Sequence, residues 1–148
     1  MSERAWKIIS ILLLTWAVSV TALYANSRLS TTNSGNSGST ITVNIGIKYK
    51  GGNVEWYNST EVPAGATLLG ATEVVADVNY TTYPGMGAFI NSINGVENEK
   101  PYYWIWWTWN PSTGWTFGPV AADKYVLSDG ETVMWYYEDT SKYPPEKP

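Results

Sequence analysis

The sequence predicts an α+β fold in which one helix covers a mixed β-sheet, preceded by a single hydrophobic helix at the N-terminus. Residues 41–49 alternate apolar and polar side chains, the two-residue period of a strand with one buried face. Thr67 precedes the segment with helical spacing of apolar residues, and short aromatic or β-branched segments follow it. A chain of 148 residues has room for one such domain and an export segment.

The N-terminal segment has the pattern of an export signal. Arg4 and Lys7 precede an uncharged run from Ile8 to Ala25, whose length lies between that of a signal-peptide core and that of a spanning helix. We expect residues 1–25 to form an uncleaved signal anchor, with the rest of the chain on the extracytoplasmic side of the cell membrane. Cleavage as a signal peptide is the alternative and would give a secreted protein. Residues 26–40 form a Ser/Thr/Asn/Gly linker, which we expect to be flexible.

The expected domain spans residues 41–139. A turn at residues 50–53 joins the first strand to a returning strand, and Thr67 is expected to cap a helix whose apolar side begins with Leu68 and Leu69. Asn94-Gly95 predicts a tight turn. The further strands are expected at residues 78–83, 88–93, 102–109 and 131–138. Residues 140–148 form a Pro-rich tail.

Four segments together resemble the transcobalamin C-terminal-like domain, a family of exported β-grasp modules of largely unknown function. They are Val62–Leu69, Ala88–Val96, the Tyr103-Trp104 pair and Ala122–Glu131. The resemblance covers residues 41–138 and implies a β-grasp-like mixed sheet with one covering helix. In transcobalamin-like proteins this domain lies over one face of a corrinoid and a separate helical domain holds the other face. Because no helical domain is evident here, the resemblance implies at most a partial corrinoid-binding domain.

Composition disfavours several function classes. The chain has no cysteine and no histidine, which removes thiolate nucleophiles, His-dependent triads and most transition-metal sites. From Asn26 onward the chain holds twelve acidic and seven basic residues, so we expect no nucleic-acid partner. Asp123, Asp129 and Glu131 lack calcium-loop spacing and are interpreted as solvated turn residues. We predict no catalytic residue, no metal and no cofactor, and therefore no enzyme.

Aromatic side chains provide the strongest indication of function. Both faces of the strand at residues 102–109 are aromatic, so one set of rings either fills the core or faces a partner. We expect Tyr102, Trp104 and Trp106 to face outward, with Trp115 on a loop at the rim. Such rings suit a glycan, a small planar ligand or an envelope protein. If the strands at residues 102–109 and 131–138 pair, their rings form one aromatic platform.

The sequence therefore predicts a membrane-anchored, extracytoplasmic binding module without catalytic activity. A surface-structural or adhesive subunit that self-assembles is the alternative. Asn58 and Asn79 each begin an N-glycosylation triplet, which is relevant because we expect the domain to be exported.

Overall fold

The computed structural model describes residues 38–148. The predicted anchor and most of the linker lie outside these residues. Gly38–Pro148 forms one compact unit that contains the described hydrophobic core, so this unit has what it needs to fold by itself. No helix within residues 38–148 is long and apolar enough to cross a membrane.

A five-stranded mixed sheet forms the larger layer of this unit. Its strand order is β2-β1-β8-β6-β7, antiparallel throughout except that β1 and β8 pair in parallel at its centre. Apolar residues alternate along β1, where Val43, Ile45 and Ile47 are fully buried, as the two-residue period predicts. The strands are β1 (Thr40–Lys48), β2 (Val54–Pro63), β6 (Tyr102–Asn110), β7 (Gly114–Phe117) and β8 (Thr132–Asp139).

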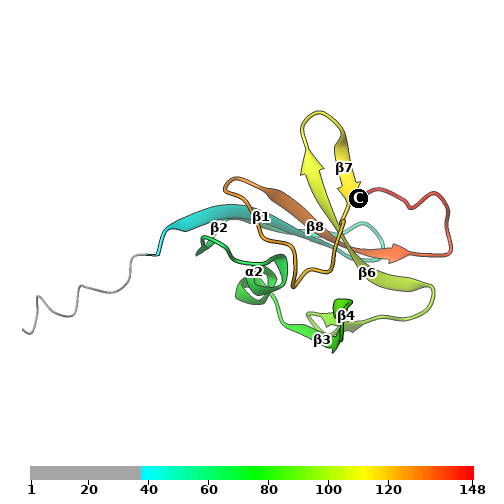
Figure 1. Ribbon diagram of the computed structural model, residues 1–148. Coiled ribbons are helices and arrows are strands. Elements are labelled where there is room, and N and C mark those ends of the chain that lie inside the picture. Colours follow the sequence, from blue (N-terminus) through cyan, green and yellow to red (C-terminus); the bar gives the residue numbers. More distant parts are fainter. Residues whose placement is uncertain (1–37) are drawn as a thin grey trace, which may run out of the picture. The chain divides into compact units, whose positions relative to one another are not determined.

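One helix and a small second sheet pack on the same side of the larger sheet. Figure 1 shows both beneath β1 and β8. Helix α2 spans Leu68–Val75, and its N-cap Thr67 accepts a hydrogen bond from the Gly70 N–H at 3.2 Å. The second sheet has the order β3-β4-β5, and its strands are β3 (Val78–Tyr83), β4 (Gly87–Ile93) and β5 (Val96–Glu97).

Buried indole groups connect these layers through hydrogen bonds. Trp135 is 1% exposed, and its Nε1–H donates to the Thr72 hydroxyl of α2 at 2.8 Å. Trp104 donates to the Val96 carbonyl of β5 at 2.7 Å. Each indole fills the core and also satisfies its only polar atom, as buried tryptophans usually do.

Residues 118–131 have little regular structure but hold several elements together. Trp106 donates its indole N–H to the Val120 carbonyl at 2.9 Å, and its ring lies 4.6 Å from the Tyr125 ring. The first backbone N–H groups of α2 donate to carbonyls of this segment, from Leu68 to Tyr125 and from Leu69 to Ala122. The segment thus supplies hydrogen-bond acceptors for N–H groups of the first helical turn that have no partner within the helix. It also covers one end of the core.

The predicted α+β fold is confirmed, with one short helix within residues 38–148. Every strand expected from the sequence within residues 38–148 is present, and β6 pairs with β8, the condition on which the predicted aromatic platform depended. Asn94 and Gly95 both have positive φ angles, 49° and 76°, as the predicted tight turn requires. Two short strands, β5 and β7, were not predicted, and Trp115 lies on β7 rather than on a loop.

Candidate functional site

The side of the five-stranded sheet opposite α2 carries a group of aromatic side chains, and we call it the open face. Register places Gly46 of β1 beside Trp56 of β2 and beside Met134 of β8, and Trp107 of β6 beside both Met134 and Phe117 of β7. One cross-strand row therefore runs over all five strands. Two of its aromatic rings are exposed, Trp56 by 43% and Phe117 by 50%.

Glycine at position 46 makes this row possible. A Cβ atom there would lie 3.1 Å from the Trp56 ring and 2.9 Å from the Met134 methyl group, so both side chains lie over the bare backbone of β1. Trp107 fills the next position and is 3% exposed, with its ring 5.4 Å from Phe117 at 78°. The row thus has two buried side chains, Met134 and Trp107, between two exposed rings, those of Trp56 and Phe117.

A second pair of rings continues the open face toward the tip of the β6–β7 hairpin. Trp109 and Trp115 are cross-strand partners whose rings lie 5.3 Å apart at 66°, and Trp109 is 45% exposed. Their neighbours across the sheet are Asn44 and Thr132, whose side chains share a hydrogen bond of 3.2 Å. In this described part of the sheet, neither the five-strand row nor the Trp109–Trp115 row holds a charged residue.

Charged groups gather at the other end of the open face. Lys48 lies 4.5 Å from the centre of the Tyr136 ring, and Lys142 pairs with Glu146 at 2.8 Å. Glu138 is only 3% exposed, and burial raises the pKa of its carboxyl group above the usual range, although the Trp107 indole N–H at 3.3 Å opposes this shift. The two aromatic rows of the open face are therefore neutral, with these charged groups on one side and the exposed Glu61, opposite Thr42, on the other.

The expectation that Trp104 and Trp106 face outward is wrong. They are 4% and 7% exposed and lie on the face covered by α2, the second sheet and residues 118–131. That expectation depended on one helix being the only cover of this face. The second sheet and the irregular segment supply the additional cover, so both rings belong to the core.

The other two predicted contact residues are partly accessible but lie on opposite sides of the sheet. Tyr102 is half-buried at the end of the covered face, stacked on Tyr137 at 5.6 Å and with the Lys50 ammonium 4.1 Å from its ring centre. Trp115 is half-buried on the open face. The four residues predicted as one surface are thus not brought together.

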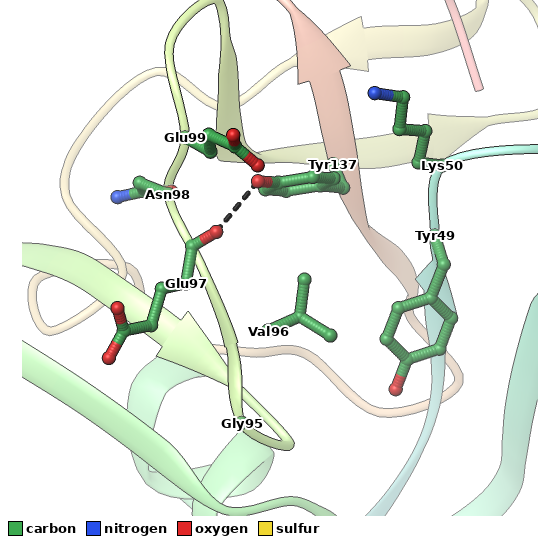
Figure 2. A pocket seen from close by; sticks show the side chains of 8 residues that line it. All are labelled: Tyr49, Lys50, Gly95, Val96, Glu97, Asn98, Glu99 and Tyr137. Atoms are coloured by element: carbon green, nitrogen blue, oxygen red, sulfur yellow. Dashed lines mark hydrogen bonds between the residues drawn. The ribbon is translucent and has the colours of Figure 1, made fainter.

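A shallow pocket of about 620 Å³ lies at the end of β1, beside β5. Figure 2 shows Lys50 on one side and Glu97 and Glu99 on the other, with Tyr137 between them. The Tyr137 hydroxyl donates to the Glu97 carbonyl at 2.6 Å, which fixes the β5 segment to β8. This pocket offers both signs of charge but is open to solvent.

The phenols of the pocket act as structural groups. The Tyr49 hydroxyl donates to Glu55 at 3.0 Å and accepts from the Asn94 amide at 3.0 Å. Burial, together with the neighbouring Glu55 carboxylate, raises the pKa of Tyr49, while the Asn94 amide lowers it. Tyr49 therefore stays protonated near neutral pH. No group of three or more acidic, His or Cys side chains within residues 38–148 is placed to hold a metal ion.

Both glycosylation triplets lie on strands at sheet edges. Asn58 is on β2, and Asn79 is on β3, and both side chains are exposed. Both asparagines are therefore accessible to a glycosyltransferase, and their glycosylation stays a prediction.

Three residues that were not predicted form the exposed aromatic surface, namely Trp56, Trp109 and Phe117. Phe117 lies beyond the segments that were read as strands. Trp109 shares a face with Trp107, and the choice between the two faces of β6 had no independent signal. Trp56 could have been found from Gly46, because a glycine inside an alternating strand indicates a close approach by a neighbour.

Comparisons with known proteins agree with this fold. The family model described as a domain of unknown function, DUF4430, matches residues 65–139. Haptocorrin in complex with Cbi is similar in structure, with a TM-score of 0.54, 20% identity and 69% of this chain covered. This chain spans 26% of the haptocorrin chain. No curated protein matches the sequence.

A second solved structure is similar over nearly its whole length. It is a candidate metal-binding protein from Ruminococcus gnavus, with a TM-score of 0.50 and 15% identity, and the match covers 67% of this chain and 97% of that one. At these identities the likeness concerns the fold alone. Together with the family match, it confirms the resemblance to transcobalamin C-terminal-like domains.

Proposed function

The chain belongs to the DUF4430 family of domains of unknown function, and from this premise we propose that it is a non-catalytic, extracytoplasmic binding module. Its N-terminal run after Arg4 and Lys7 would tether it to the membrane. The two neutral aromatic rows of the open face would then contact the ligand. The observation that carries this proposal is the exposure of Trp56, Trp109 and Phe117 on one side of one sheet.

The chemistry of this surface favours a neutral glycan. Aromatic rings cover the apolar faces of sugar rings at little entropic cost, and amide and hydroxyl groups beside them, such as Asn44 and Thr132, supply hydrogen bonds. The absence of charge from these two rows of the described sheet disfavours a strongly charged ligand. Met134 and Trp107 are buried between the exposed rings of Trp56 and Phe117, and side chains that are already packed lose little conformational entropy on binding.

The test is a binding comparison on a printed array of neutral and acidic oligosaccharides, probed with residues 38–148. We expect Trp109→Ala and Trp115→Ala to lower binding of neutral glycans at least tenfold. Tyr83→Ala is the matched control, because Tyr83 is 46% exposed but lies on β3 of the other sheet. Thermal unfolding of each variant separates lost contact from lost folding. Equal binding by wild type and both tryptophan variants would exclude this surface.

Corrinoid binding is a second candidate, favoured only by the likeness to haptocorrin. That likeness covers about a quarter of haptocorrin, so this chain would form part of a site at most. Titration with dicyanocobinamide, followed by its visible spectrum, tests the idea directly. Saturable binding that survives Trp109→Ala and Trp115→Ala would favour the corrinoid over the glycan.

A further inference from the structure

Strand edges with unpaired backbone groups are the usual places where β-sheets recruit another strand. Within residues 38–148 the larger sheet ends in β2 and β7, and the smaller sheet ends in β3 and β5. Native proteins commonly protect such edges with charge, proline, bulges or very short strands. The four edges here differ sharply in this protection.

Three of the edges are protected or interrupted. Strand β2 carries two glutamates and a terminal proline, and it is bulged where Ser59 has a positive φ angle of 52°. Strand β5 has two residues, one of them Glu97. The β3 ladder changes register between Asn79 and Tyr80. In addition, β2 and β3 each carry a glycosylation triplet, at Asn58 and Asn79.

Strand β7 is also short, with four residues, but it lacks the other devices. It reads Gly-Trp-Thr-Phe over Gly114–Phe117, without a charge, a proline or a bulge, and its pairing with β6 is regular. The preceding turn is well formed, because the Asn110 side chain accepts from the Ser112 N–H at 2.8 Å. The exposed edge is therefore a regular, preformed strand.

The hydrogen-bond pattern shows which groups of β7 are available. The Gly118 N–H donates to the Trp106 carbonyl at 2.9 Å, and Thr116 lies opposite Thr108. Because antiparallel ladders alternate, Thr116 directs its N–H and C=O toward β6. The backbone N–H and C=O groups of Trp115 and Phe117 therefore point away from the sheet, where another strand could pair with them.

We propose that β7 pairs antiparallel with β7 of a second copy of this chain, about a two-fold axis at Thr116. Trp115 of one copy then lies opposite Phe117 of the other, and each such pair exchanges two backbone hydrogen bonds. The aromatic rings meet on the open face, and the two Thr116 side chains meet on the other face. The strand is thus complementary to itself, as a two-fold interface requires.

The dimer is expected to be weak and favoured by tethering. Two four-residue strands bury less than the roughly 1,000 Å² that stable interfaces need. The net acidic charge of the exported part also repels a second copy, although β7 itself is uncharged, so added salt should strengthen pairing. Confinement to one membrane raises the effective concentration and offsets the small area.

A charge exchange at the two-fold axis tests the proposal. Thr116 is exposed and its backbone bonds lie within the β6–β7 ladder, so Thr116→Lys and Thr116→Glu should both fold. In a two-fold dimer each substitution faces its own copy, and like charges repel. Sedimentation velocity of residues 38–148, from about 10 µM to about 1 mM, covers the range of weak complexes.

We expect wild type to dimerise reversibly, each Thr116 variant alone to dissociate at least tenfold more readily, and an equimolar mixture of the two to recover the dimer. Tyr83→Ala, on β3, should behave as wild type. Wild type that stays monomeric at about 1 mM would overturn the proposal, as would dimers unaffected by both Thr116 variants. Glycan binding is read on the array, at concentrations below self-association, so failure of one proposal is distinguishable from failure of the other.

A second comparison separates backbone pairing from ring stacking. Phe117→Pro and Phe117→Ala both remove the ring, but only proline also removes the outward N–H, and edge strands tolerate proline at such positions. We expect proline to weaken the dimer at least tenfold more than alanine. Equal effects of the two variants would mean that the rings associate without strand pairing, which would overturn the proposal.

Discussion

Gly118→Ala is expected to destabilise the domain through a single methyl group. An added Cβ would lie 2.6 Å from the Trp106 Nε1 and closer still to two carbons of the same ring. The indole cannot move aside easily, because it is 7% exposed, donates to the Val120 carbonyl at 2.9 Å and packs against Tyr125. Either the ring or residues 118–120 must shift.

The expected cost lies at the upper end of the usual overpacking range, about 2–3 kcal/mol. For a unit of this size that corresponds to a fall in Tm of about 10–15 °C. Gly70→Ala is the matched control. Its nearest neighbour would be the Thr67 hydroxyl at 3.4 Å, and alanine in a helix is favoured over glycine by up to about 1 kcal/mol. Chemical denaturation monitored by circular dichroism measures both changes.

A double-mutant cycle identifies the cause. Trp106→Leu shortens the side chain that the new methyl group meets, so Gly118→Ala should cost little in that background. The expected coupling is about 1–3 kcal/mol, with the double variant more stable than the sum of the single effects. If Gly118→Ala is harmless in wild type, or equally harmful in both backgrounds, then Trp106 does not pack on Gly118 and its assignment to the core is wrong.

Two further predictions follow from Glu138 and from the N-terminal segment. Because burial raises the pKa of Glu138 in the folded state, the folded state binds this proton more tightly than the unfolded state does. The domain therefore loses stability as the pH rises from the pKa of Glu138 in the unfolded chain to its pKa in the folded domain. Glu138→Gln should therefore raise Tm at neutral pH, and a gain that persists undiminished below the unfolded pKa would contradict the cause. The full chain should fractionate with membranes and expose residues 38–148 to external protease, whereas mature protein beginning near Leu23 or Asn26 would show cleavage.

Local patterns in the sequence were sufficient for most elements of the fold. Alternation in residues 41–49, the Thr67 cap and the Asn94-Gly95 turn each depend on neighbours along the chain, and each was predicted correctly. Strand β5 was missed because two residues show no period. Strand β7 was missed because Pro111 to Gly114 indicated a loop, and the strand beyond that loop has only four residues.

The candidate surface was harder to predict because it depends on what covers each face. A strand such as β6, aromatic on both sides, gives no local signal of which side is buried. That choice was made by the second sheet and by residues 118–131, whose carbonyl groups receive the indole N–H of Trp104 and Trp106. The sequence therefore indicated an aromatic-rich sheet but did not identify the exposed rings.

The position of β8 has a consequence for the order of assembly. This last strand lies between β1 and β6, so the β1–β2 and β6–β7 hairpins share no ladder until residues 132–139 are present. The five-stranded sheet can therefore be completed only after synthesis has reached β8, and a chain halted before Thr132 lacks the strand that joins the two hairpins. Because the β1–β8 pairing joins residues about 88 positions apart, closure carries a large loop entropy and should be slow for a domain of this size. A peptide with the β8 sequence, added to the truncated domain, would complete the sheet in trans.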